Sequence, residues 1–340
     1  MNKEQLEQIA NGMVADGKGI LAADESTGTI KKRFDQISTE STEDSRRDYR
    51  ELLFRSDEAM QNWISGVILF DETIRQNSKD GSPLVDLITA AGSIPGIKVD
   101  AGAQDLAQSP GEKVTEGLDG LRSRFQEYHA LGARFAKWRA VINIADHLPS
   151  QYCLNANAHA LARYAALAQE NNIVPIVEPE VIMDGTHSIE RCFEVTEAAL
   201  NALYDALYEQ RVFLEGTILK PNMVISGTEN TNRANIDEVA EQTVLCLKRT
   251  VPSAVPGICF LSGGQSEEEA TAHLSAMNAN FDMPWKLSFS YGRALQQSAL
   301  QAWQGKDENI GAAQAAFNHR AKMNGLAAKG EWQATLEKAA

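Results

Sequence analysis

The run Ile173-Val174-Pro175-Ile176-Val177 is continuously apolar and is followed at once by Glu178-Pro179-Glu180. A strand that is buried on both faces has this composition in a parallel sheet, because none of its side chains faces solvent. The run Gly66-Val67-Ile68-Leu69-Phe70 has the same character. These two stretches predict a parallel sheet that is covered by helices.

Six more β-rich runs alternate with segments long enough for a crossover helix. The predicted strands cover residues 19–24, 65–70, 96–99, 134–141, 173–177, 216–220, 258–262 and 286–290. Eight strand-then-helix units predict an α/β fold, a single (β/α)8 barrel domain over residues 1–340. We expect an additional amphipathic helix at the surface within residues 1–15 and a short C-terminal tail. A doubly wound open sheet is the alternative that periodicity leaves open.

Helical spacing supports the crossover segments. Apolar residues recur on one face at Leu161, Tyr164, Ala165 and Ala168, at Val195, Ala198, Ala199 and Ala202, and at Ile236, Val239, Ala240 and Thr243. Ser266 followed by three glutamates is typical of a helix N-terminus, where a hydroxyl caps the first turn and the dipole favours acids.

The composition excludes several classes of protein. The chain has 340 residues with 32 bases and 46 acids, a formal net charge of −14, which disfavours nucleic acid or an anionic membrane as a partner. No stretch is apolar for long enough to span a membrane, and residues 1–15 lack the apolar core of a signal peptide. The four cysteines are scattered, as in reduced cytoplasmic proteins. The six histidines show no metal-ligand spacing, so we expect neither a metal nor another cofactor.

Polar residues follow the predicted strands at the end where a barrel holds its active site. These strand-end residues are Asp24, Glu25 and Ser26, then Lys98, Lys137, Arg139, Glu178, Glu180 and Lys220, and finally Ser262, Gly263, Gly264, Ser290, Gly292 and Arg293. A single one of them is typical of an ordinary surface residue or turn. Their recurrence on seven strands indicates a shared site at one mouth of the barrel.

The charge of this mouth points to an anionic substrate. Five cations of the mouth, Lys98, Lys137, Arg139, Lys220 and Arg293, outnumber the three anions Asp24, Glu178 and Glu180, although the whole chain is acidic. Ser262-Gly263-Gly264 precedes a predicted helix, and backbone N–H groups at such a position bind phosphate. Ser290, Gly292 and Arg293 add a hydroxyl, an N–H and a guanidinium on the neighbouring strand. A sugar phosphate is the substrate class that this pattern favours.

Two lysines with carboxylates suggest the chemistry. Lys137 and Lys220 are predicted to face each other across the mouth, where a second cation and desolvation would lower a lysine pKa and leave a nucleophilic amine. A neutral lysine forms a Schiff base with a ketone, and the iminium accepts electrons when a neighbouring C–C bond breaks. Glu178 and Asp24 are placed to move the protons.

The chain resembles the class I fructose-bisphosphate aldolases over nearly all of its length. The resemblance rests on eight motifs in order: GKGILAADESTGTI, GVILFDET, GIKVD, FAKWR, IVPIVEPE, LEGTILKPNMV, FLSGGQSEEEA and SFSYGRALQ. It implies reversible cleavage of fructose 1,6-bisphosphate in glycolysis and gluconeogenesis. It also implies a cytoplasmic homotetramer.

The resemblance assigns roles motif by motif. It implies that Lys220 forms the Schiff base, that Glu178 is the acid/base with Glu180 beside it, and that Asp24 takes the C4 hydroxyl proton or orients the group that does. Lys137 would assist proton transfer and lower the pKa of Lys220, with Arg139 next to the substrate. The 1-phosphate site would comprise Ser262, Gly263, Gly264, Ser290, Gly292 and Arg293. The 6-phosphate region would comprise Ser26, Thr29, Arg33 and Lys98, with Arg46 in a matching RRDYR run.

The C-terminus departs from the family pattern. Animal and plant members end in a flexible tail whose terminal tyrosine assists proton exchange, whereas the last tyrosine of this chain is Tyr291. Glu178, Glu180, Lys137 or an ordered water are the remaining proton donors to the enamine. Because the tail carries no catalytic group, we expect its removal from Trp332 onward to change little.

Two other readings compete with this one. A transaldolase-type or deoxyribose-phosphate aldolase-type barrel also uses a Schiff-base lysine, but the two predicted phosphate sites favour a bisphosphate. A binding or scaffold protein could retain the barrel, but it has no need of two lysines in a crowded mouth.

Overall fold

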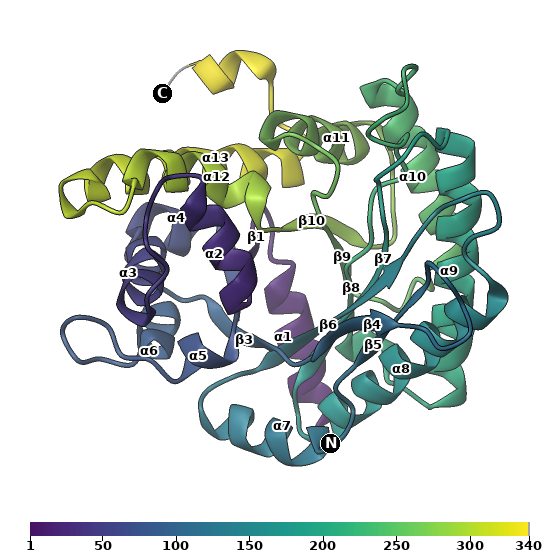
Figure 1. The fold of residues 1–340 in the computed structure, drawn as a ribbon, viewed down its shortest axis with the longest axis horizontal. Coiled ribbons are helices and arrows are strands. Elements are labelled where there is room, and N and C mark those ends of the chain that lie inside the picture. Colours follow the sequence, from purple (N-terminus) through teal and green to yellow (C-terminus); the bar gives the residue numbers. More distant parts are fainter. Residues whose placement is uncertain (339–340) are drawn as a thin grey trace.

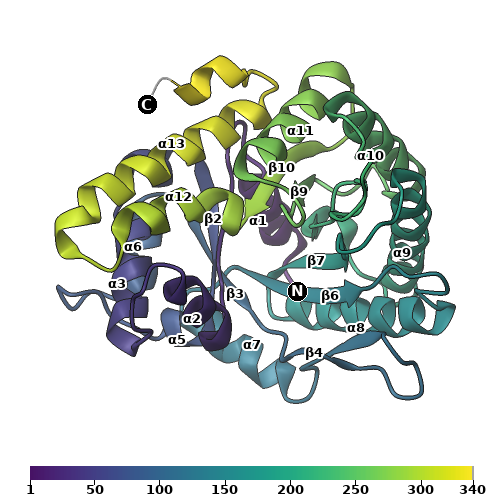
Figure 2. The same ribbon diagram turned by 45° about the horizontal axis from the view of Figure 1, so that its top comes forward.

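The computed structural model describes residues 1–338, and its centre is a closed barrel of eight parallel strands (Figures 1 and 2). Around the barrel the order is β1, β10, β9, β8, β7, β6, β3, β2. Their bounds are β1 (Gly19–Ala23), β2 (Ile64–Leu69), β3 (Ile94–Lys98), β6 (Phe135–Ile142), β7 (Val174–Val181), β8 (Ile218–Leu219), β9 (Gly257–Phe260) and β10 (Lys286–Tyr291). The predicted (β/α)8 barrel is confirmed, and the open sheet is excluded because β1 pairs with both β2 and β10.

Thirteen helices are described within residues 1–338, most of them in a ring outside the strands (Figure 1). They are α1 (Lys3–Met13), α2 (Thr27–Asp35), α3 (Glu43–Phe54), α4 (Asp57–Asn62), α5 (Asp71–Ile74), α6 (Leu84–Ala90), α7 (Leu121–Ala130), α8 (Gln151–Glu170), α9 (Ile189–Glu209), α10 (Ile236–Thr250), α11 (Glu267–Asn280), α12 (Arg293–Trp303) and α13 (Ile310–Ala328). Three 3-10 turns are η1 (Leu214–Gly216), η2 (Asp307–Asn309) and η3 (Ala334–Lys338). Within the described residues, no helix has the length and apolar character needed to cross a membrane.

Most of the predicted helix faces are buried. The α8 face is buried throughout, and Ser266 caps α11 in a capping box with Glu269. Ala198 and Ala202 on α9 are only partly buried, and Ile236, which begins α10, is 44% exposed.

Two features of the sheet differ from the prediction. An antiparallel hairpin, β4 (Gly102–Asp105) with β5 (Lys113–Glu116), lies in the chain between β3 and β6 and was not predicted. Strand β7 continues through Glu178 and Glu180 to Val181, so these two acids lie within the strand and not after it.

Helix α1 closes the amino-terminal end of the barrel and is therefore more than the predicted surface helix. Its buried residues Leu6, Ala10 and Met13 form a second apolar cluster, separate from the main core. The barrel residues of that cluster are Ile20, Ala22, Ile68, Phe135, Val174, Ile176, Ile218 and Cys259. In Figure 1, α1 lies inside the ring of outer helices.

The inward-facing residues change character along each strand. In β7, Val174 and Ile176 belong to this lower cluster, and the same face continues two and four residues later as Glu178 and Glu180. Two other strands repeat the change, from Phe135 to Lys137 in β6 and from Ile218 to Lys220 after β8. The apolar floor thus excludes water from beneath a charged mouth.

Candidate active site

A cavity of about 350 Å³ opens at the carboxyl ends of the strands. Its lining contains most of the predicted site residues, namely Asp24, Ser26, Thr29, Arg33, Lys98, Lys137, Arg139, Glu180, Lys220, Ser262, Gly263, Ser290, Gly292 and Arg293. A larger groove of about 730 Å³ contains none of them and is lined by Glu7 of α1 and by Trp285 and Lys286 at the start of β10. The chemistry therefore belongs to the smaller cavity.

Four charged side chains meet at the bottom of the barrel mouth, and we call them the lysine–carboxylate cluster. Asp24, Lys137 and Lys220 line the cavity, whereas Glu178 does not. The Nζ atom of Lys137 lies 2.7 Å from Oδ2 of Asp24 and 3.4 Å from Oε2 of Glu178. The Nζ atom of Lys220 lies 3.1 Å from Oε1 of Glu178. Glu178 therefore bridges the two lysines, and all four residues are buried or nearly so.

The cluster holds Asp24 and Lys137 in their charged forms. Burial raises the pKa of Asp24, but Lys137 and Lys220 outweigh this and bring the pKa to about 2. Burial lowers the pKa of Lys137, but Asp24 and Glu178 more than reverse that effect and raise it above the usual range. Around neutral pH, Asp24 is a carboxylate and Lys137 is an ammonium.

A second layer of ion pairs lies beside the lysine–carboxylate cluster. Arg139 pairs with Glu180 through its Nε atom. Lys98 Nζ lies 2.9 Å from Oδ1 of Asp100, whose other oxygen accepts a hydrogen bond from the backbone N–H of Arg139 at 3.3 Å. Asp100 lines the cavity, and sequence reasoning missed it although it ends the GIKVD motif.

The ends of β9 and β10 provide hydrogen-bond donors for an anion. Ser262, Gly263, Ser290, Gly292 and Arg293 line the cavity, and α12 begins at Arg293, directly after Gly292. Among the described residues, the buried Ser290 hydroxyl has no hydrogen-bond partner. A free hydroxyl beside a helix N-terminus and a guanidinium is suited to binding phosphate.

Gly264 lies behind this cradle and does not line the cavity. Its φ of +72° is left-handed, and a Cβ atom there would come within 2.6 Å of Met183. Gly264 therefore shapes the turn that presents Ser262 and Gly263, a structural position where the sequence predicted direct contact.

The start of α2 provides the other polar wall. The hydroxyls of Ser26 and Thr29 lie 3.1 Å apart, and Arg33 pairs with Glu25. A Cβ atom on Gly292 would lie 3.4 Å from Nη2 of Arg33, so this arginine adjoins the β10 end of the cavity. The family resemblance instead implied that Arg33 lies with Lys98, on β3, around the 6-phosphate.

Arg46 does not belong to the cavity. Its Nε donates to Glu72 at 2.8 Å and its Nη1 donates to the backbone oxygen of Ser41 at 3.1 Å. Arg50, one turn further along α3, is the residue of the RRDYR run nearest the site, and its Nη2 donates to the backbone oxygen of Glu25 at 2.9 Å. Arg46 and Arg50 share one face of α3, and the packing of this helix places Arg50, not Arg46, against the site wall.

The described part of the chain holds no group of three or more His, Cys, Asp or Glu side chains placed to share a metal ion. The ionisable groups of the cavity are instead mixed in sign and paired with one another.

Comparison with known proteins gives one consistent result. The family model for fructose-bisphosphate aldolase class-I matches residues 5–340. A probable fructose-bisphosphate aldolase class 1 from Xanthomonas axonopodis pv. citri is 62% identical, over 98% of this chain and 100% of that protein. A cytoplasmic isozyme of fructose-bisphosphate aldolase from Spinacia oleracea is 55% identical over 96% of this chain and 92% of its own. The solved structure of the Plasmodium falciparum aldolase superposes with a TM-score of 0.95 at 50% identity, covering 97% of this chain and 96% of that one.

Proposed function

The chain belongs to the class I fructose-bisphosphate aldolase family, and on that premise we propose which residues carry each step of its reversible cleavage of fructose 1,6-bisphosphate. The neutral amine of Lys220 adds to the C2 carbonyl carbon, and loss of water leaves a protonated Schiff base. The iminium accepts the electron pair of the C3–C4 bond as that bond breaks. The C4 hydroxyl loses its proton and becomes the aldehyde carbonyl of the first product, glyceraldehyde 3-phosphate. Protonation of the enamine at C3 and hydrolysis then release dihydroxyacetone phosphate and regenerate Lys220.

Glu178 is the acid/base in this proposal. Its Oε1 atom lies 3.1 Å from Lys220 Nζ, within reach of a proton on the attacking amine or on the departing hydroxyl of the carbinolamine. Lys137 lies beside the other oxygen of Glu178 and carries a positive charge. This charge favours the return of Glu178 to its carboxylate form after each proton transfer. Glu180, Lys137 and water remain candidates beside Glu178 for enamine protonation.

Asp24 orients the C4 hydroxyl. A carboxylate with a pKa of about 2 is a weak base, but it is a strong hydrogen-bond acceptor that remains ionised throughout the reaction. This favours the orienting role over direct removal of the proton, which then passes to Glu178.

The two ends of the cavity would take the two phosphates. We assign the 1-phosphate to Ser262, Gly263, Ser290, Gly292 and Arg293, because the Ser290 hydroxyl has no hydrogen-bond partner among the described residues and α12 begins with the Arg293 guanidinium. The 6-phosphate is assigned to Ser26, Thr29 and Lys98. Arg33, which adjoins Gly292, lies on the 1-phosphate side in this assignment.

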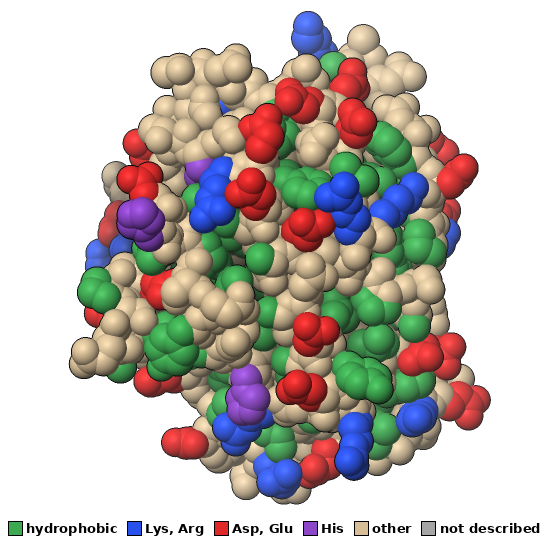
Figure 3. Space-filling view, turned by 90° about the vertical axis from the view of Figure 1, so that its right-hand side faces the viewer, with side chains coloured by type: hydrophobic (Ala, Val, Ile, Leu, Met, Phe, Trp, Pro, Cys, Tyr) green, Lys and Arg blue, Asp and Glu red, His purple; other side chains and the backbone are tan. Residues whose placement is uncertain are grey.

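We propose that residues 1–340 form one domain that assembles as a homotetramer in the cytoplasm. Support comes from family membership and from the name of the spinach cytoplasmic isozyme. Large hydrophobic residues are also exposed on neighbouring helices: Tyr152 on α8, Tyr208 on α9, and Ile236 and Leu245 on α10. Figure 3 shows apolar patches between scattered charges on this side of the molecule. Light scattering of the purified protein measures the assembly state, and a monomer would refute it.

The observation that carries the proposed mechanism is the single carboxylate of Glu178 in contact with both Lys137 and Lys220, the two lysines that line the cavity. In this mechanism the iminium supplies the electron sink, so cleavage of fructose 1,6-bisphosphate should be unaffected by EDTA. The assay follows release of glyceraldehyde 3-phosphate with and without the chelator. Activity that is lost with EDTA and restored by zinc would overturn the Schiff-base mechanism.

A further inference from the structure

The C-terminal segment that follows α13 is bound to the outside of the barrel. Trp332 packs against the main core, and its Nε1 donates a hydrogen bond to Oε1 of Glu337 at 2.9 Å. In Figures 1 and 2 the segment lies beside α13 and near α11. The contacts conflict with the expectation that residues from Trp332 onward do little.

Glu337 neutralises a buried arginine. Its Oε2 atom accepts from Nη1 of Arg320 at 2.5 Å and lies 3.1 Å from Nε2 of His319. Arg320 is only 4% exposed, and the Glu337 side chain is 9% exposed. Among the described residues, Glu337 is the one carboxylate paired with Arg320. A buried cation that loses its partner carries a desolvation penalty, so the position of Arg320 depends on this contact.

Arg320 carries the contact onward to α11. Its Nη2 donates to Oγ1 of Thr271 at 2.6 Å and to the backbone oxygen of Glu267 at 3.2 Å. Thr271 in turn donates to Oδ1 of Asn324 at 2.7 Å, and neither residue is exposed. The N-terminal part of α11 is therefore linked to α13 through Arg320, whose charge is neutralised by Glu337.

The first turn of α11 also fixes the 1-phosphate side of the cavity. The Tyr291 hydroxyl donates to the backbone oxygen of Ala270 at 3.0 Å, and Tyr291 lies between Ser290 and Gly292 in the chain. The Glu267 carboxylate accepts from both the backbone N–H and the hydroxyl of Ser298 in α12, at 3.1 and 2.5 Å. The end of β10 and the middle of α12 are thus both held by α11.

We propose that Glu337 is a positioning residue for substrate binding, and that Trp332, Glu337, Arg320 and Thr271 form a C-terminal latch. The latch sets the position of α11 and, through Tyr291 and Glu267, of the donors that would hold the 1-phosphate. This inference rests on the proposed function, which places the 1-phosphate at Ser290, Gly292 and Arg293. The tail of this chain would then act from outside the barrel, without entering the cavity.

The test compares Glu337→Gln with Glu331→Gln, which removes an equal charge from an exposed position in the same segment. We expect KM for fructose 1,6-bisphosphate and for fructose 1-phosphate to rise about tenfold in Glu337→Gln, which corresponds to about 1.4 kcal/mol. Both substrates should be affected equally because both carry the 1-phosphate, whereas kcat should remain within about twofold. The control should match the wild type.

A second variant guards against loss of folding. Arg320→Gln combined with Glu337→Gln removes both charges together, so no unpaired cation is left in the interior. This protein should show the same rise in KM, because its link from the tail to α11 is weakened. Unchanged KM values in both variants, even with a lowered Tm, would overturn the latch and leave Glu337 a purely structural role.

A covalent readout separates this inference from the proposed function. At saturating dihydroxyacetone phosphate, borohydride should modify Lys220 in Glu337→Gln as fully as in the wild type, while the concentration for half-modification rises. An unmodified wild type would refute the Schiff-base assignment. Wild-type and variant proteins modified at the same low concentration would refute the latch alone.

Discussion

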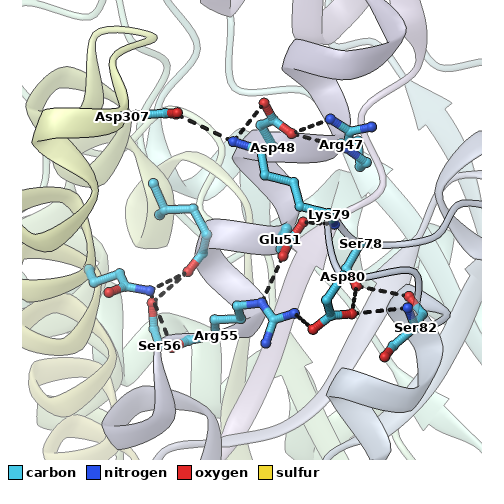
Figure 4. A network of polar contacts seen from close by, with 12 residues as sticks. Arg47, Asp48, Glu51, Arg55, Ser56, Ser78, Lys79, Asp80, Ser82 and Asp307 are labelled. Atoms are coloured by element: carbon cyan, nitrogen blue, oxygen red, sulfur yellow. Dashed lines mark hydrogen bonds and ion pairs between the residues drawn. The ribbon is translucent and has the colours of Figure 1, made fainter.

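The surface network around Lys79 and the buried cluster around Lys137 are built from the same residue types and differ in their access to water. In the surface network, drawn in Figure 4, Lys79 Nζ lies 3.2 Å from Asp48 and 3.4 Å from Asp307. In the cluster, Lys137 Nζ lies 2.7 Å from Asp24 and 3.4 Å from Glu178. The Lys79 side chain is 46% exposed and that of Lys137 is 5% exposed.

The two sites differ in how strongly water screens their ion pairs, and this decides whether the pairs can shift a pKa. At the surface, water and salt screen the charges, and a pair such as Lys79–Asp48 contributes little. Inside the barrel the same attraction is strong enough to bring the pKa of Asp24 to about 2 despite the opposing effect of burial. The apolar floor formed with α1 makes this possible, because it keeps water away from the charged mouth.

The largest expected difference between the regions follows from removing one lysine from each. Lys220→Met should reduce cleavage of fructose 1,6-bisphosphate to the background rate, because Lys137, the other amine beside Glu178, is held as an ammonium by Asp24 and cannot form the Schiff base with the substrate ketone. Lys79→Met should retain wild-type kcat and KM. Both are measured by steady-state assay on proteins with matching circular dichroism. Substantial cleavage by Lys220→Met would place the nucleophile elsewhere.

The next effect concerns the bridging acid. Glu178→Gln should lower kcat by about 10²–10⁴-fold, the usual contribution of a positioned general acid or base. Glu51→Gln is the control: this carboxylate is also buried, accepts from Arg55 at 2.8 Å in the network of Figure 4 and lies outside the cavity, so its loss should leave kcat unchanged. Equal kcat values for Glu178→Gln and the wild type would remove Glu178 from the mechanism.

The phosphate assignments predict a smaller and more selective effect. Arg293→Ala should weaken binding of fructose 1,6-bisphosphate and fructose 1-phosphate alike, by about 1.5–3 kcal/mol, because a charged hydrogen bond is lost. Lys98→Ala should affect mainly the bisphosphate, since the monophosphate has no 6-phosphate. Measured KM values for both substrates test this, and equal losses in Lys98→Ala would move Lys98 away from the 6-phosphate.

Several of these assignments followed from the sequence because they depend on strand periodicity. An apolar run that ends in charges two residues apart places those charges on one inward face, as in Lys137 and Arg139 or Glu178 and Glu180. The closure of the barrel, which periodicity could not distinguish from an open sheet, then brings the ends of all eight strands to one mouth. The Gly263-Gly264 turn before a predicted helix likewise allowed the phosphate-binding end of the cavity to be predicted from the sequence.

Other features could not be predicted, because they depend on contacts between distant parts of the chain. Arg46 and Arg50 occupy the same helix and the same motif, and only the packing of α3 decides which one reaches the site wall. The β4–β5 hairpin has short polar strands without an apolar run. The ion pair between Glu337 and Arg320 could not be predicted either, since no sequence pattern pairs these two residues.

The smallest expected effect is on stability in acid. The pKa of Asp24 falls from an unfolded value near 3.8 to about 2 on folding, so its stabilising contribution is complete above about pH 4 and is lost as the pH falls towards 2. The contribution amounts to about 2 kcal/mol. Urea unfolding of the wild type and Asp24→Asn should therefore differ less at pH 2.5 than at pH 6. Asp48→Asn in the surface network should cost less than about 1 kcal/mol, and a constant difference for Asp24→Asn across this range would contradict the account.

The central claim is that Lys220, among all the lysines of the chain, becomes the nucleophile because it lies beside Glu178, whereas Lys137 is held as an ammonium by both Glu178 and Asp24. Borohydride reduction in the presence of dihydroxyacetone phosphate, followed by peptide mass spectrometry, tests it directly. The account predicts one stable adduct per chain, on Lys220, with Lys137 and Lys79 unmodified. An adduct on Lys137, or no adduct in a protein that still cleaves fructose 1,6-bisphosphate, would contradict it.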